Sequence, residues 1–140
     1  MRRLLVPVDG SKCSLRALKY AAAQSRYGPV TLHLLNTRPP RDDYGMVGAH
    51  MTVQQHRKAA MARAKETLKR AVAVVGPRVR SQTHAVIGDA ATAIVGAARR
   101  LGCESIVMGT HGRGALGILI LGSVATKVVH LAKVPVTLVK

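Results

Sequence analysis

Five strand candidates, separated by segments of helical periodicity, restrict the fold of this chain more than any other feature. The candidates lie at residues 4–8, 30–35, 79–87, 105–108 and 136–139. Between them, apolar residues recur at helical spacing in segments that begin after Ser11, at Val53, at Ala90 and at Ser123. Parallel strands need long crossover connections, and helical crossovers pack on the faces of the sheet. The alternation therefore predicts an α/β fold: a single doubly wound five-stranded parallel sheet with helices on both faces.

The residues available for a core are almost entirely aliphatic. The 140 residues include no Phe or Trp, although 48% of them are hydrophobic. This length and composition predict one domain over residues 1–140. No run approaches the roughly 18 apolar residues of a membrane span, and the short apolar start does not resemble a secretion signal. Cys13 and Cys103 have no metal-ligand spacing. A cytoplasmic protein without membrane insertion is expected.

The balance of charge is unusual. Lys and Arg number 22 against six Asp and Glu, which gives a formal net charge of +16. The long helical segment from residue 53 to 75 has Glu66 as its only acid and six basic residues, which are Arg57, Lys58, Arg63, Lys65, Lys69 and Arg70. A solvated helix face explains such residues, but they also repel one another and would attract a polyanion. A nucleic acid or an acidic protein is therefore retained as an alternative partner.

The longest expected loop covers residues 37–49. It contains two prolines, two aspartates and two glycines, and its roughly 13 residues exceed the usual ~4–6 of a connection. This length makes it a candidate lid. A different turn signal follows the helix expected from Ala90 to Leu101, because Gly102 stands where a left-handed helix cap is favoured.

A glycine-rich stretch follows the fourth strand and reads GTHGRGALGILILGS from Gly109 to Ser123. In open parallel sheets, ligands bind beyond the carboxyl ends of the strands, where the strand order reverses. Glycines allow backbone N–H groups to approach a ligand, and the first N–H groups of the helix that opens at Gly122 favour an anion. The stretch indicates a phosphate site flanked by Asp9 at the end of the first strand. The alternative is that the glycines only shape a loop.

The spacing Gly109-x2-Gly112-x9-Gly122-Ser123 resembles the nucleotide-binding signature G-x2-G-x9-G-[ST] of the universal stress protein family. LLVPVDGS at the start, LHLLN in the second strand, GD after the third and PVTLV at the end are also similar to that family. The resemblance implies a Rossmann-like fold of the adenine nucleotide alpha hydrolase type and places the chain in the ATP-binding subgroup. It further implies ATP, AMP or ADP as ligand, with Mg²⁺ compatible with the phosphates. A homodimer that pairs through the last strand, Val136 to Val139, is implied as well.

The same resemblance assigns roles to individual residues. Pro7, Val8 and Asp9 resemble the first-strand contacts near adenine and ribose, and Leu34 resembles the hydrophobic residue against the adenine. Gly88 ends the third strand near the site. Ribose and phosphate contacts are implied for a further group, which is Gly109, Gly112, Gly122, Ser123 and Val124, with Arg113 as a basic residue at the phosphates.

Catalytic chemistry has little support in the sequence. No nucleophile–base pair accompanies the glycines, and Asp9 is the only obvious carboxylate at the site. His111 has no carboxylate nearby in sequence to orient it, so it is expected to shape the loop or face solvent. His33 is expected to be satisfied by neighbours in its strand. No catalytic residue and no metal site are assigned. We expect an ATP-binding sensor or switch of the stress response, with a slow ATPase and a basic interaction protein as alternatives.

Overall fold

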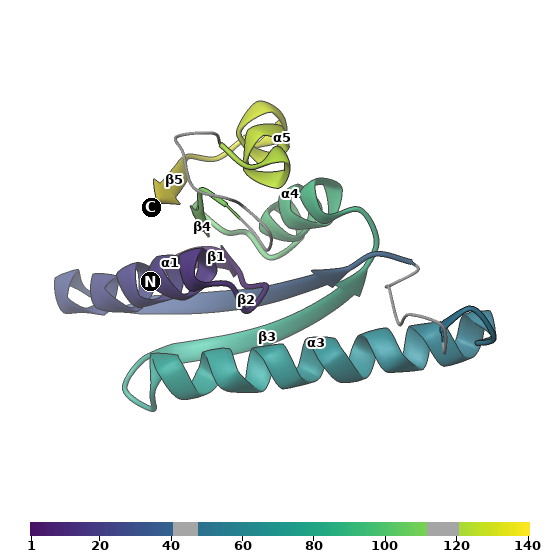
Figure 1. Cartoon of the computed structure of the whole chain (residues 1–140). Coiled ribbons are helices and arrows are strands. Elements are labelled where there is room, and N and C mark those ends of the chain that lie inside the picture. Colours follow the sequence, from purple (N-terminus) through teal and green to yellow (C-terminus); the bar gives the residue numbers. More distant parts are fainter. Residues whose placement is uncertain (41–47, 112–120) are drawn as a thin grey trace.

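The computed structural model describes residues 1–40, 48–111 and 121–140 of the chain (Figure 1). Strands and helices alternate as the sequence predicts. The elements are β1 (Arg2–Pro7), α1 (Lys12–Ala23), a 3-10 turn η1 (Gln24–Tyr27), β2 (Val30–Arg38), α3 (Val53–Val75), β3 (Arg80–Ile87), α4 (Ala90–Arg100), β4 (Ser105–Gly109), α5 (Ser123–Leu131) and β5 (Val136–Val139). The second strand continues to Arg38, so the first two residues of the expected loop at 37–49 belong to the sheet. Residues 41–47, the middle of that loop, lie outside the described residues.

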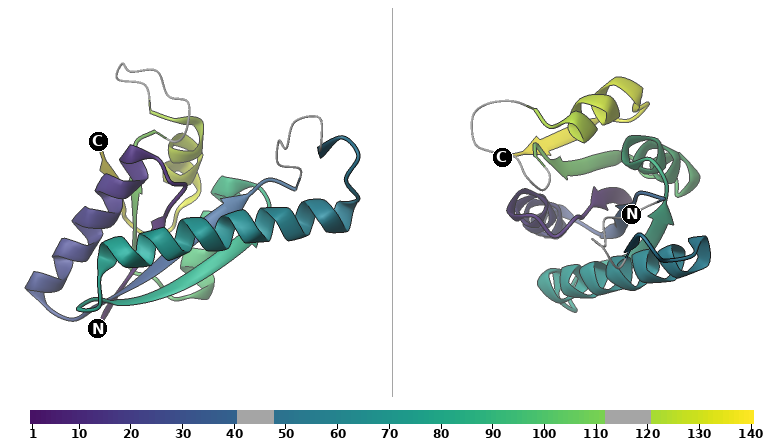
Figure 2. Two further views of the ribbon diagram at one scale, coloured as in Figure 1. Left: turned by 60° about the horizontal axis from the view of Figure 1, so that its bottom comes forward. Right: turned by 45° about the vertical axis from the view of Figure 1, so that its right-hand side comes forward.

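All five strands pair in parallel, in the order β3-β2-β1-β4-β5. Helices α1 and α3 pack on one face of the sheet, and α4 and α5 pack on the other (Figure 2). The chain begins at the centre with β1, fills one half through β2 and β3, and then crosses over to β4. The strand order therefore reverses between β1 and β4. The predicted doubly wound sheet with helices on both faces is confirmed.

The core is divided between the two faces of the sheet because successive side chains of a strand point to opposite sides. Leu4 and Val6 of β1 pack with α1 and α3, whereas Leu5 packs with α4 and α5. Alanines such as Ala17 and Ala97 are fully buried, which lets the helices approach the sheet closely. Among the described residues, no helix is both long and apolar enough to cross a membrane.

The helix ends follow the sequence signals. Ser11 caps α1, because its hydroxyl oxygen accepts a hydrogen bond from the Ser14 N–H at 3.1 Å. At the start of α3, the Thr52 side chain accepts from the Gln55 N–H and the Gln55 side chain accepts from the Thr52 N–H, which forms a capping box. Gly102 follows α4 with φ +61°, the left-handed conformation expected from the sequence.

Candidate functional site

A cleft of about 450 Å³ opens at the carboxyl ends of β1 and β4, where the strand order reverses. Open parallel sheets bind ligands at this position, and the volume lies in the range of small-molecule sites. Six segments form its walls: the turn after β1, the first turn of α1, the end of β2, the end of β4, and the amino-terminal parts of α4 and α5. The lining residues are Pro7, Val8, Asp9, Ser14, Leu35, Thr37, Ala90, Ile94, Met108, Gly109, Thr110, His111, Gly122, Ser123, Val124 and Ala125.

The turn between β1 and α1 holds Asp9 at the wall of the cleft. Its Oδ1 accepts a hydrogen bond from the Ser11 N–H at 2.8 Å, an Asx-type turn that bends the chain into α1. Gly10 adopts φ +84° inside this turn, a backbone conformation that favours glycine. The Asn36 amide of β2 donates to the Val8 carbonyl at 2.7 Å and ties the turn to the neighbouring strand. The sequence Asp-Gly-Ser therefore fixes the position of the carboxylate.

The amino end of α5 is the part of the cleft best suited to an anion. Helices α1, α3 and α4 are each capped by a side chain, from Ser11, Thr52 and Asp89 respectively. Gly122 stands at that position in α5 and has no side chain with which to cap it. Its own N–H donates to the Thr110 carbonyl at 2.8 Å, which anchors the helix start to the end of β4. The first three N–H groups of α5 have no partner within the helix and can bind a ligand.

The amino end of α4 also borders the cleft, but a carboxylate already occupies it. Asp89 Oδ2 accepts hydrogen bonds from the Thr92 N–H at 3.0 Å and from the Thr92 hydroxyl at 2.9 Å. These bonds, together with the positive charge of Lys127, hold the pKa of Asp89 below its ordinary value. The carboxylate stays ionised and would repel a second anion. Of the two helix ends at the cleft, only that of α5 is electrostatically open.

Most of the residues predicted for the site meet at the cleft. Seven of them line it together, namely Pro7, Val8, Asp9, Gly109, Gly122, Ser123 and Val124. Gly112 and Arg113 lie outside the described residues, so their roles stay predictions. Gly88 does not line the cleft. It ends the edge strand β3, and its N–H donates to the Arg38 carbonyl at 2.8 Å.

The structure places Leu34, the residue predicted to lie against the adenine, away from the described cleft. Leu34 is fully buried and packs in the core between the sheet and the pair α1 and α3. Its neighbour Leu35 points to the opposite face and lines the cleft. The apolar side chain that β2 presents to a ligand is therefore that of Leu35. The period-two alternation of strand side chains could have revealed this from the sequence, had the face of one β2 residue been known.

A packing contact that the sequence alone did not reveal explains why residue 109 is a glycine. A Cβ built at Gly109 would lie 2.8 Å from both the carbonyl carbon and the Cβ of Cys13, and 3.0 Å from its oxygen. The end of β4 thus passes directly against the first turn of α1. This glycine is needed for close packing of strand and helix, in addition to any approach of a ligand.

Several lining residues were not predicted individually. Ile94 and Met108 form an apolar wall with Leu35, and Thr37 adds a hydroxyl at the end of β2. His111 lines the cleft, and its Nδ1 lies 3.0 Å from Thr110 Oγ1 in a shared hydrogen bond. That contact fits the loop-shaping role expected for His111. Asp9 is the only acid among the lining residues, so the described cleft pairs no carboxylate with another.

The other histidine considered in the sequence lies away from the cleft. His33 Nδ1 and His84 Nε2 lie 3.1 Å apart across β2 and β3, and the two rings are stacked with centroids 5.3 Å apart. Among the described residues, His33 Nε2 is buried without a partner, so the expected satisfaction holds for one nitrogen only. Burial is the main cause that lowers the pKa of His33, and the neighbouring His84 and Arg3 lower it further. Burial also lowers the pKa of His84, with a smaller effect from Arg100. Within the described segments, no three His, Cys, Asp or Glu side chains cluster to hold a metal ion.

Fold and cleft together describe a doubly wound α/β protein with a cleft of small-molecule size at its topological switch point. The model of the universal stress protein family matches residues 1–140. A universal stress protein of Thermus aquaticus is 34% identical over 139 residues, which cover 99% of this chain and 98% of the relative. The chain belongs to the universal stress protein family.

Solved structures agree with this assignment. The protein MJ0577 of Methanocaldococcus jannaschii superposes with a TM-score of 0.83 at 25% identity, over 99% of this chain and 95% of that chain. A universal stress protein of Archaeoglobus fulgidus in complex with dAMP gives a TM-score of 0.70 at 23% identity, over 100% and 98% of the two chains. Another, in complex with cAMP, gives 0.67 at 23% identity, over 99% and 95%. At these identities the last two establish the shared fold.

Proposed function

We propose that the cleft binds an adenine nucleotide, with ATP as the principal ligand. The observation that carries the proposal is the uncapped amino end of α5 at the switch point of the sheet. The first N–H groups of α5, which have no partner within the helix, and the Ser123 hydroxyl supply donors for phosphate oxygens. The ribose then lies beside Asp9, whose carboxylate can accept hydrogen bonds from sugar hydroxyls. The adenine rests against the apolar wall that includes Leu35.

The solved relatives support the ligand class. One universal stress protein structure contains dAMP and another contains cAMP, both of which are adenine nucleotides. Gly112 and Arg113 complete the proposed phosphate contacts on the strength of the family signature. Mg²⁺ would be held by the phosphates, and the carboxylate of Asp9 and the hydroxyl of Ser123 are oxygen groups of the described cleft that could add ligands.

The proposed role is a switch and not an efficient hydrolase. Hydrolysis of ATP requires a positioned water and metal-held carboxylates, and the described lining contains Asp9 as its single carboxylate. A nucleotide that binds one arrangement of the site better than another shifts the population toward that arrangement.

We propose a cytoplasmic stress-response module of one domain, residues 1–140. β5 lies at the edge of the sheet with β4 as its one neighbour, which makes Val136–Val139 available for pairing in a homodimer. Sedimentation equilibrium, which gives the molecular mass in solution, tests whether the protein is a homodimer.

The test places a carboxylate at the start of α5. Gly122 has φ −60° and ψ 155°, a conformation open to any residue, and Asp is among the best N-cap residues. Gly122→Asp should therefore retain or raise the midpoint of urea unfolding, because the new side chain caps α5. In calorimetry, the same change should weaken ATP binding by more than about tenfold, because the carboxylate takes the N–H groups and repels the phosphates.

Gly122→Asn is the matched control. Its amide has nearly the shape of the carboxylate but no charge, so it should weaken ATP binding less than Gly122→Asp does. Equal affinity of wild type and Gly122→Asp for ATP would show that the phosphates do not bind at α5 and would overturn the proposal. Phosphate release above background that disappears in Asp9→Asn would favour the slow ATPase instead.

A further inference from the structure

The outer side of α3 carries a row of three lysines. Ala60, Ala64, Leu68, Ala71 and Val75 form the buried stripe of this helix. Lys58, Lys65 and Lys69 are exposed and stand seven and four residues apart, a spacing that places them on one side of a helix, well away from the buried stripe. The amino-terminal turns of α3 extend beyond the carboxyl end of β3 (Figure 1). Within the described residues, the three exposed lysine side chains are accessible to a large partner.

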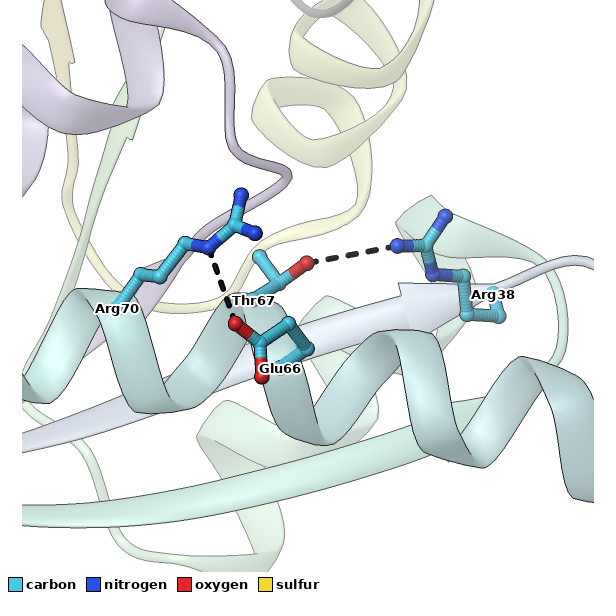
Figure 3. A network of polar contacts seen from close by, with 4 residues as sticks. All are labelled: Arg38, Glu66, Thr67 and Arg70. Atoms are coloured by element: carbon cyan, nitrogen blue, oxygen red, sulfur yellow. Dashed lines mark hydrogen bonds and ion pairs between the residues drawn. The ribbon is translucent and has the colours of Figure 1, made fainter.

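The acid of α3 does not neutralise this row. Glu66 Oε1 lies 3.2 Å from Arg70 Nε, on the side of the helix where Arg38 of β2 donates to the Thr67 hydroxyl at 3.5 Å (Figure 3). Thr67 and Arg70 border a hollow that also includes Leu15 of α1, so this flank faces α1. Glu66 is the only acid of α3. Glu66 stands three residues before Lys69 and pairs with the exposed Arg70, so this one acid faces six basic side chains along α3.

The geometry points to the phosphate backbone of a double-stranded nucleic acid as the partner of the lysine row, which is defined as Lys58, Lys65 and Lys69. Eleven residues of helix span about 16 Å, at about 1.5 Å per residue. Phosphates of one strand follow one another every ~3.4 Å along the axis of the duplex. The row can therefore reach three separate phosphates of one duplex. Lysines act as point charges, so the contact positions the protein without reading the base sequence.

The composition of this side of α3 favours a duplex over other anionic partners. Ala62 lies between the lysines on the same side, with Gln54 before the row and Ala73 after it, and all three are exposed. One exposed apolar side chain, Val72, stands three residues after Lys69. A helix that binds a membrane surface needs large apolar anchors, and a protein interface needs buried aromatic or arginine anchors. Single-stranded nucleic acid is held by aromatic stacking, and α3 contains no Phe, Tyr or Trp.

This surface is separate from the cleft. α3 packs on the face of the sheet opposite to α4 and α5, and none of its residues lines the cleft. Loss of nucleic-acid binding and loss of nucleotide binding can therefore be distinguished. A variant of the lysine row should bind ATP as the wild type does, and Gly122→Asp should bind duplex as the wild type does.

The experiment measures fluorescence anisotropy of a labelled 20-base-pair duplex with the full-length protein between 50 and 200 mM salt. Each phosphate contact contributes about 0.9 to the slope of log affinity against log salt. The triple variant Lys58→Gln, Lys65→Gln, Lys69→Gln should lower that slope by about 2.7 units. The control triple Lys19→Gln, Arg26→Gln, Lys133→Gln removes the same charge from exposed positions elsewhere. It should lower the slope by less than about one unit.

Two outcomes overturn the proposal. Equal losses in the two triple variants would mean that the net charge of the whole protein, and not the α3 row, attracts the duplex. Tighter binding of polyglutamate or of phosphatidylserine vesicles than of the duplex at the same salt, lost in the α3 variant, would identify an acidic protein or a membrane as the partner. A selective loss of duplex binding in the α3 variant supports the proposal.

Discussion

Gly109→Ala adds a methyl group where the end of β4 passes against the first turn of α1. The new carbon would lie 2.8 Å from the carbonyl carbon and the Cβ of Cys13, and 3.0 Å from its oxygen. Carbon atoms pack best at about 3.5–4.0 Å, so the two carbon contacts are short by about 0.7 Å or more. Two of the three atoms are backbone atoms, so a change of rotamer cannot relieve the overlap. The start of α1 must move away from β4.

Overpacking of this kind costs about 1–3 kcal/mol. For a protein of this size a urea m-value of about 2 kcal/mol/M is typical, so the midpoint of urea unfolding should fall by about 0.5–1.5 M. The displaced helix start carries the turn with Asp9, so ATP binding should weaken as well. Circular dichroism in urea and calorimetry with ATP measure the two effects.

Gly88→Ala is the matched control, because a Cβ at Gly88 meets no atom within 4 Å and the backbone there does not require glycine. Its stability should stay within about 0.5 kcal/mol of the wild type. If Gly109→Ala unfolds at the same urea concentration as the wild type and Gly88→Ala, the close approach of β4 and α1 is refuted.

Three further predictions concern other parts of the fold. Burial and neighbouring positive charge lower the pKa values of His33 and His84 in the folded state, so the unfolded state binds more protons below the ordinary pKa of about 6.5. The free energy of unfolding should therefore fall as pH drops from about 6.5. His84→Gln should flatten this pH dependence in urea titrations. Asp89→Ala removes the cap of α4 and should cost about 1 kcal/mol in the same assay, and unchanged stability would contradict the capping role. Leu34→Ala and Leu35→Ala should each lower the free energy of unfolding by about 2–5 kcal/mol. Only Leu35→Ala should also weaken ATP binding to the protein that remains folded. An equal loss of ATP affinity in the two variants would contradict the placement of Leu34 and Leu35 on opposite faces of the sheet.

The order of strands and helices was predictable because each element carries its own local signal. The strand candidates became parallel strands, largely buried in β1, β2 and β4 and only partly buried in β3 and β5. Gly102 ended α4 in the left-handed conformation expected for it. The helical segment expected after Ser11 begins there, and the Ser11 hydroxyl makes the bond that caps α1. The strand β2 ran on to Arg38 because pairing with β3 continues to Ile87, a tertiary effect that the local sequence does not encode.

The candidate site was predictable only where a motif stands at the end of a strand or the start of a helix. Asp9 and Gly122 were found in this way, and both line the cleft. Leu35 was missed in favour of Leu34 because the choice between adjacent strand residues depends on which face of the sheet each one meets. The contact of Gly109 with Cys13 joins residues distant in the chain, so spacing alone could not reveal it.

The most direct test of the central claim is a titration of ¹⁵N-labelled protein with ATP, followed in amide correlation spectra. Binding of ATP in the cleft should give saturable shifts that are largest at the amides of Ser123, Val124 and Ala125, which open α5. Smaller shifts are expected in the turn around Asp9. Shifts confined to α3 around Lys65, or linear shifts that vanish at 200 mM salt, would mean that ATP is attracted only as a polyanion. That result would contradict the claim that the cleft at the switch point is the nucleotide site.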